Sequence, residues 1–153
     1  MTANLATVSA VPDTEKESRD PKTFMSNEQW DRLVALMVRD YPWDTVMADR
    51  VLGQAVAYLI TAMETWGQNL EIGCGFLVDV GVHTMILDTP FYREFCQKYH
   101  GQFLEHMPEI ARKVDGSVEK TAKVIAGNGF AIDWPLWQAD FANCTPCRPG
   151  HSH

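Results

Sequence analysis

The strongest constraint on the fold is a series of segments in which apolar residues recur every three or four positions. Residues 26–42, SNEQWDRLVALMVRDYP, form the first, with Ser26 or Asn27 as a helix N-cap and Pro42 as a stop. The apolar positions with this spacing are Trp30, Leu33, Val34, Met37 and Val38. The pattern predicts an amphipathic helix.

Similar patterns continue along the chain. Residues 44–67 begin with Asp44 as a cap and predict a helix of about five turns. Residues 89–108, 117–130 and 133–144 carry further helix start and stop signals. No two alternating apolar runs are joined by a hairpin turn. We therefore predict an all-α chain, a single compact bundle of about five or six helices.

Residues 78–88, VDVGVHTMILD, are ambiguous by themselves. Their β-branched valines favour a strand, and the run is too short for its periodicity to decide. A helix start follows at once, with Thr89 as N-cap and Pro90 at the first helical position, so the context favours a helix. Residues 67–77, which are rich in glycine, are expected to form a loop.

Length and composition indicate one domain, because 153 residues with 46% apolar and 22% charged side chains can close a hydrophobic core. Residues 1–25 are polar and aperiodic, and we expect a flexible leader there. Residues 26–143 are expected to form the helical domain, and residues 144–153 an irregular Cys/His tail. The net charge of −7 provides no basic field, so nucleic acid and membrane surfaces are not expected as partners.

The beginning of the sequence lacks the charged start and apolar run of a secretory signal, and no continuous apolar run reaches about 20 residues. A cytoplasmic protein is therefore expected, in which thiols stay reduced. On this basis the four cysteines should be free, metal-bound or redox-active. The expected partner is a small-molecule substrate, with a homodimer as an option.

Asp79 and His83 interrupt the apolar run of residues 78–88. They are four positions apart, so on a helix both side chains leave the same face. A hydrogen bond between them would fix the imidazole tautomer and leave the other ring nitrogen to bind a metal or to act as a base. Both could instead be metal ligands, or they could form a buried pair that holds the core. Asp79 and His83 are the candidate catalytic residues.

The segment CTPCRPGHSH offers a second candidate metal site. Cys144 and Cys147 have the separation at which two thiolates bind one tetrahedral ion, and His151 and His153 offer nitrogen ligands. The alternatives are a redox dithiol and an exposed tail without a site. Cys144, Cys147 and His151 are the ligands predicted for a metal here.

His106 lies in the segment predicted to be helical over residues 89–108. It would return toward His83 if this helix packs antiparallel to the preceding one. With Asp79, the two histidines would form the ligand set of open non-haem iron sites, or, with a thiolate, a zinc site. Alternatively, His100 and His106 lie on a solvated helix face. We expect a transition metal bound by His83 and His106, with zinc ahead of iron or copper.

Aromatic side chains provide a candidate substrate pocket. Its predicted members are Tyr58, Tyr92, Cys96, Trp134 and Trp137. Aromatic groups of this kind also serve as core anchors, which is the alternative interpretation.

The run VDVGVHTMILDTPFYREFC, followed by GQFLEHMP and CxxC, resembles short bacterial glycine-rich domain-containing proteins and, more distantly, the plant glycine-rich domain proteins. The bacterial core reads V-D-x-G-W-H-T-F-I-L-H-T-x-x-Y-x-x-F-C. The resemblance extends over about residues 28–147, and its central twenty positions are specific. It implies that Asp79, His83 and Cys96 are functional and names no reaction. The chain departs from the pattern at Val82, where the family has Trp, and at Asp88, where it has His. The matching positions are Asp79, Gly81, His83, Thr84, Ile86, Leu87, Thr89, Tyr92, Phe95, Cys96, Gly101, Phe103, His106 and Pro108.

Together these features predict a metal-binding all-α protein, a small-molecule-modifying enzyme of a specialised biosynthetic route with a His/Asp(/Cys) metal site. Hydrolysis, hydration and oxygen activation remain equal options for its reaction. One alternative is a non-catalytic interaction module stabilised by zinc on the tail. The other is a metal-free catalyst in which Asp79 and His83 act as acid and base.

Overall fold

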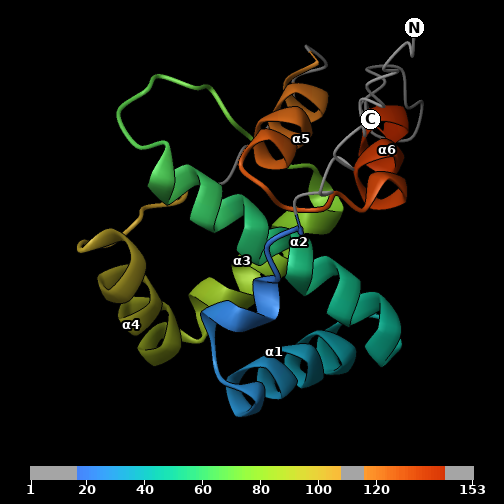
Figure 1. Cartoon of the computed structure of the whole chain (residues 1–153). Coiled ribbons are helices and arrows are strands. Elements are labelled where there is room, and N and C mark those ends of the chain that lie inside the picture. Colours follow the sequence, from blue (N-terminus) through green and yellow to red (C-terminus); the bar gives the residue numbers. More distant parts are fainter. Residues whose placement is uncertain (1–16, 108–115, 144–153) are drawn as a thin grey trace, which may run out of the picture.

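The computed structural model describes residues 17–107 and 116–143, which form a bundle of helices (Figure 1). The described part contains six α-helices, one short 3-10 helix and no strand. The predicted all-α fold is confirmed. The elements are η1 Pro21–Phe24, α1 Asn27–Asp40, α2 Thr45–Glu64, α3 Phe76–Leu87, α4 Thr89–His100, α5 Ser117–Gly127 and α6 Trp134–Asn143.

Helices α2 and α3 form the centre of the bundle (Figure 1). α2 contacts η1, α1, α3, α4 and α5, and α3 also contacts α1, α4 and α6. By length and composition alone α2 could cross a membrane, but 67% of its apolar window is buried inside the fold. α2 is therefore the core helix against which most of the other elements pack.

Capping residues set where the helices begin. Ser26 caps α1 through a reciprocal capping box, and Asp44 caps α2 with its side chain, both as predicted. At α4 the N-cap is Asp88 rather than Thr89. The Asp88 carbonyl accepts the backbone N–H of Tyr92, so this helix begins one residue earlier than the sequence pattern predicted.

The ambiguous segment is helical, as its context predicted, and forms most of α3. Its valines are buried against other helices instead of pairing in a sheet. Gly81 lies where α3 meets α2, and a Cβ there would lie 2.7 Å from the Cβ of Ala55 and 3.2 Å from Cγ1 of Val51. A glycine at this position therefore allows the two central helices to approach closely.

The N-terminus of α3 is held by a side chain from α6. Asp140 is 2% exposed, and its carboxylate accepts the backbone N–H of Leu77 at 3.1 Å. A negative group at this end also interacts favourably with the helix dipole. A Cβ at Gly75 would overlap the Asp140 carboxylate, so the N-cap position of α3 is occupied by glycine. α6 thus fixes the start of the helix that carries Asp79 and His83.

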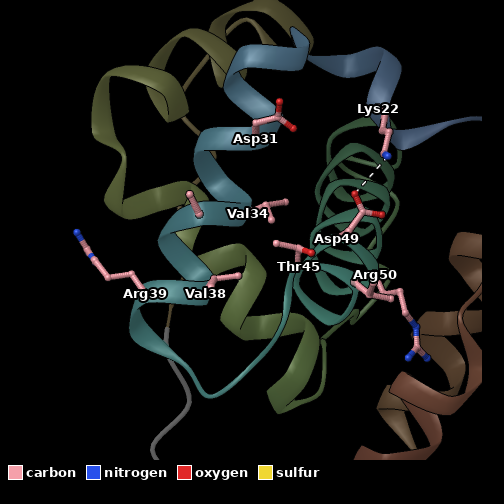
Figure 2. A pocket seen from close by; sticks show the side chains of 10 residues that line it. Lys22, Asp31, Val34, Val38, Arg39, Thr45, Asp49 and Arg50 are labelled. Carbon is pink, nitrogen blue, oxygen red and sulfur yellow. Dashed lines mark ion pairs between the residues drawn. The ribbon is translucent and has the colours of Figure 1, made fainter.

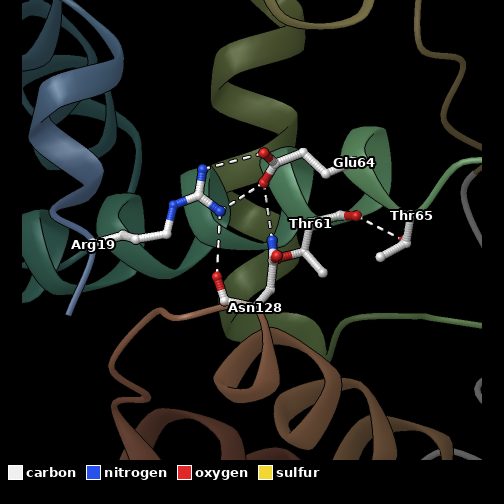
Figure 3. A network of polar contacts seen from close by, with 5 residues as sticks. All are labelled: Arg19, Thr61, Glu64, Thr65 and Asn128. Carbon is white, nitrogen blue, oxygen red and sulfur yellow. Dashed lines mark hydrogen bonds and ion pairs between the residues drawn. The ribbon is translucent and has the colours of Figure 1, made fainter. Parts of the chain in front are cut away.

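The packed part of the chain begins before Ser26. Arg19 donates two hydrogen bonds to the Glu64 carboxylate at the end of α2, at 2.6 and 3.2 Å, and a third to the Asn128 carbonyl (Figure 3). Its guanidinium also lies over the Phe130 ring. Arg19, which falls within the predicted leader over residues 1–25, is thus attached to the helical domain. Residues 1–16 lie outside the described residues.

The contact between Arg19 and Glu64 should make stability depend on pH. Hydrogen bonding to Arg19 holds the pKa of Glu64 below its ordinary value of 4.5, against the opposing effect of burial. The contact therefore stabilises the fold above pH 4.5, and this stabilisation is lost as pH falls through the lowered pKa. We expect the difference in free energy of unfolding between wild type and Arg19→Ala, measured by urea denaturation, to shrink on acidification.

The matched control is Arg39→Ala, which removes an arginine paired with Asp40 at the exposed end of α1. It should change stability little at any pH, because exposed pairs contribute little. A difference between wild type and Arg19→Ala that stays constant down to pH values well below the ordinary pKa would contradict the predicted linkage.

Candidate metal centre

Three side chains converge beside α3. Nε2 of His83 and Nε2 of His106 lie 3.1 Å apart. The carboxylate of Asp79 lies 3.1 Å from Nε2 of His106 through Oδ1 and 3.4 Å from Nε2 of His83 through Oδ2. The side chains of Asp79 and His106 are each 18% exposed and that of His83 is 39% exposed. We call these three residues the triad.

Helix α3 presents two members of the triad from one face. Asp79 and His83 are separated by four positions, which places them one turn apart on the same side of the helix. The rest of the helix is largely buried, so this polar pair marks the part of α3 that is not packed against α1, α2 or α6. The placement follows directly from the spacing in the sequence.

The third member, His106, comes from a loop and not from a helix. α4 ends at His100, because Gly101 adopts a left-handed conformation with φ of 76° and stops the helix. The prediction of a helix over residues 89–108 is therefore wrong for residues 101–107, and residue 108 lies outside the described residues. The chain instead turns back toward α3, and this reversal brings His106 to His83.

The loop is attached to α4 through Leu104. The Tyr92 hydroxyl donates to the Leu104 carbonyl at 2.6 Å, and the Leu104 N–H donates to the Cys96 thiol sulfur at 3.5 Å. Burial, and secondarily the neighbouring Cys96, raises the pKa of Tyr92, so the hydroxyl keeps the proton that it donates. Tyr92 and Cys96 thereby position the loop two residues before His106.

Protons alone satisfy the triad poorly. A neutral imidazole carries one N–H, which can point along only one line at a time. The three groups make three close contacts, two between an imidazole and the carboxylate and one between the two Nε2 atoms. Two N–H groups directed at the carboxylate would leave the contact between the nitrogens without a hydrogen bond, and a single N–H would leave two of the three contacts without one. A cation between the three groups would accept both nitrogen lone pairs and the carboxylate together.

The spacing of the ligand atoms fits a metal ion. Ligands bound at about 2.0–2.1 Å in octahedral or tetrahedral geometry lie roughly 2.9–3.4 Å from each other. The separation between the two nitrogens, 3.1 Å, and the shortest distances from them to the two oxygens of Asp79, 3.1 and 3.4 Å, fall in this range. A different carboxylate oxygen is nearest to each imidazole, and one ligand atom from each residue lies within 4.8 Å of the others. Among the described residues, Asp79, His83 and His106 are the group of His, Cys, Asp and Glu side chains placed to hold a metal ion.

Cys74 contacts the triad, although it is not among the site residues predicted from the sequence. Its thiol donates to Oδ1 of Asp79 at 3.7 Å from the loop that precedes α3. Such contacts to a ligating carboxylate orient it toward the metal. The only available signal was its position five residues before Asp79 in a glycine-rich segment, and this does not predict a contact.

Within the described part of the chain, the other predicted site residues lie in separate places and do not form one pocket. Tyr58 lines a cavity that also includes His106, whereas Tyr92 and Cys96 are each 1% exposed and pack in the core. On α6, Trp137 is fully buried and donates to Gln54, and Trp134 is 38% exposed. A role toward substrate for these residues stays a prediction. The predicted tail ligands Cys144, Cys147 and His151 lie outside the described residues.

Each histidine of the triad borders a cavity. A cavity of about 450 Å³ between the end of α2, the following loop and residues 104–106 includes His106. Another of about 360 Å³, between α1, α3 and the start of α4, includes His83. Both volumes are in the range that small-molecule sites occupy. Each histidine of the triad thus has a cavity of this size beside it.

A further groove of about 770 Å³ separates α1 from α2 (Figure 2). Apolar side chains of Val34, Val38 and Val46 line it, and an ion pair of 3.2 Å between Lys22 and Asp49 lies at its edge. No histidine or cysteine is among its lining residues. Its carboxylates, Asp31 and Asp49, therefore have no imidazole beside them in the lining, unlike Asp79 in the triad.

The chain matches no known protein family, no curated protein and no solved structure.

Proposed function

We propose that the protein is a metal-dependent enzyme that acts on a small molecule, with Asp79, His83 and His106 as the ligands of one transition-metal ion. The observation that carries the proposal is the convergence of two imidazole nitrogens and one carboxylate at 3.1–3.4 Å. We expect zinc at this site ahead of iron or copper. The resemblance to bacterial glycine-rich domain-containing proteins, a cytoplasmic location and a role in a specialised biosynthetic route belong to the same proposal.

Three protein ligands favour catalysis over a purely structural role. Structural zinc sites have four protein ligands, whereas catalytic sites keep a position for water or substrate. Two histidines and one carboxylate are also the ligand set of iron enzymes that activate oxygen. A metal held by the triad would supply Lewis acidity and an activated water. Hydrolysis, hydration and oxygen activation all fit this ligand set.

A metal-free reaction is the second candidate, and one observation favours it. The Asp79 carboxylate lies 3.4 Å from Nε2 of His83, the partner predicted from the sequence, and 3.1 Å from Nε2 of His106, so it could orient either imidazole as an acid or base. A non-catalytic module with zinc on Cys144, Cys147 and His151 is a third candidate, and it depends on residues outside the described part.

Metal titration tests the proposal, and the two candidate metal sites can be separated by mutation. In the double variant Cys144→Ser/Cys147→Ser the tail can no longer bind zinc through thiolates. We expect this variant, stripped with chelator and reloaded, to bind one equivalent of zinc by calorimetry. Cobalt as a probe should give the absorption of a site with nitrogen and oxygen ligands, without thiolate charge transfer.

The wild-type chain is the control for the tail. If the double variant binds less than about a tenth of an equivalent while the wild type binds one, the metal belongs to the tail and the zinc-module candidate is favoured. If neither chain binds metal after reloading, the metal proposals fail and the metal-free acid–base candidate remains.

A further inference from the structure

The cavity beside His106 is formed by three segments, one of which carries a member of the triad. The end of α2 contributes Tyr58 and Ala62, the following loop contributes Trp66 and Asn69, and the loop after α4 contributes His106. Its volume, about 450 Å³, matches a molecule the size of one or two aromatic rings. Because His106 belongs to both the cavity and the triad, a ligand in the cavity lies beside one of the three residues of the triad.

The lining is aromatic and aliphatic with a few neutral polar groups. Tyr58 and Trp66 supply aromatic surface, and Thr65 and Asn69 supply a hydroxyl and an amide. Trp66 is 62% exposed, which is unusual for so large an apolar side chain and leaves an indole available to a ligand. Neutral polar groups in an apolar pocket typically fix the orientation of the ligand.

The charged residues of the lining determine which ligand charge the cavity favours. Among its lining residues there is no lysine or arginine, and the acidic residue is Glu105. The chain as a whole carries a net charge of −7. In the metal-free chain an anionic ligand would enter this cavity without a lysine or arginine partner, which is unfavourable. A cationic ligand could interact with Glu105 and with the faces of the aromatic rings.

The cavity beside His83 differs in this respect. It includes Arg32 and Arg39, which are paired with Asp88 and Asp40 at 3.0 and 2.8 Å. These arginines could exchange their carboxylate partners for an anionic ligand. The cavity beside His83 is therefore expected to favour anions, and the cavity beside His106 neutral or cationic molecules. This difference makes the assignment of the substrate cavity testable.

We infer that the cavity beside His106 is the substrate pocket of the triad and takes a small aromatic molecule, neutral or cationic, with a hydrogen-bonding substituent. The inference rests on the proposed function, since it places the substrate at the metal centre. The aromatic ring lies against Tyr58 and Trp66, and the polar substituent contacts the neutral groups of the lining.

Three phenols of similar size test the inference: 4-methylphenol, tyramine and 4-hydroxyphenylacetate, which are neutral, cationic and anionic. Binding to the full-length chain is measured by calorimetry and by ligand-observed NMR. The metal-free form is used for the comparison of charges, because a carboxylate could bind directly to a loaded metal. We expect 4-methylphenol and tyramine to bind at least about tenfold more tightly than the anion.

Two variants of α2 locate the binding site. Ala62→Phe places a ring in the cavity and should abolish phenol binding, with zinc stoichiometry unchanged. Val46→Phe adds the same ring at the exposed opposite end of α2 and should have no effect. Phenol binding that survives Ala62→Phe, or an anion that binds as tightly as the others, would overturn the inference in favour of the His83 cavity or of no site.

These readouts separate the inference from the proposed function. Zinc binding without phenol binding overturns the inference and leaves the metal site standing. Phenol binding with the expected charge preference, lost in Ala62→Phe, in a chain that binds no zinc supports the pocket and overturns the metal proposal.

Discussion

His106→Ala should lower the affinity for zinc by more than about 100-fold, because losing even an outer partner of a ligand typically costs 10–100-fold. The substitution removes one of the two nitrogens and leaves Asp79 and His83 on α3 as an incomplete site. The metal-free fold should be little changed, since the loop is held at Leu104 by Tyr92. Calorimetry and thermal denaturation of the metal-free chain, in the Cys144→Ser/Cys147→Ser background, measure both effects.

His100→Ala is the matched control. His100 is the last residue of α4. Its imidazole contacts the Trp66 ring edge-on and does not belong to the triad. It should keep the zinc affinity of the parent chain. Equal affinities in His100→Ala and His106→Ala would mean that the triad does not hold the metal. A His106→Ala chain that melts far below its parent when both are metal-free would instead point to a structural role of the imidazole.

Most of the fold could be predicted because it depends on local signals. Caps such as Ser26 and Asp44 and the three- and four-residue apolar spacing act within one or two turns, so they are visible in the sequence. The helical state of α3 could not be predicted from its own valines and required the helix start that follows it. The attachment of Arg19 to Glu64 could not be predicted, because it joins positions 45 residues apart through side chains.

The triad was predictable only in part. The spacing of Asp79 and His83 is a local property, and it correctly places both on one face of a helix. His106 was expected near His83 for the wrong reason, since Gly101 ends α4 and a loop makes the return. Cys74 was missed because its contact with Asp79 depends on how a glycine-rich loop turns before α3. Contacts made by loops carry no periodicity from which they could be predicted.

Gly81→Ala should lower the free energy of unfolding by about 1–3 kcal/mol, the usual effect of adding a methyl group to a packed core. The new Cβ would lie 2.7 Å from the Cβ of Ala55 and 3.2 Å from the backbone carbonyl of Val51, so α3 must move away from α2. Helix propensity favours alanine, and the observed loss would therefore come from the contact between the helices. Chemical denaturation measures the change.

Gly53→Ala in the partner helix is the control, because its added Cβ would meet side chains at 3.9 and 4.0 Å, an ordinary contact. It should raise the free energy of unfolding by about 0.5–1 kcal/mol through helix propensity alone. Gly81 lies between Asp79 and His83, so a displaced α3 also moves two ligands relative to His106, and Gly81→Ala should bind zinc more weakly while Gly53→Ala should not. Equal stabilisation by both substitutions would contradict the predicted clash at Gly81, and unchanged zinc affinity in Gly81→Ala would show that the close approach of α2 and α3 does not position the triad.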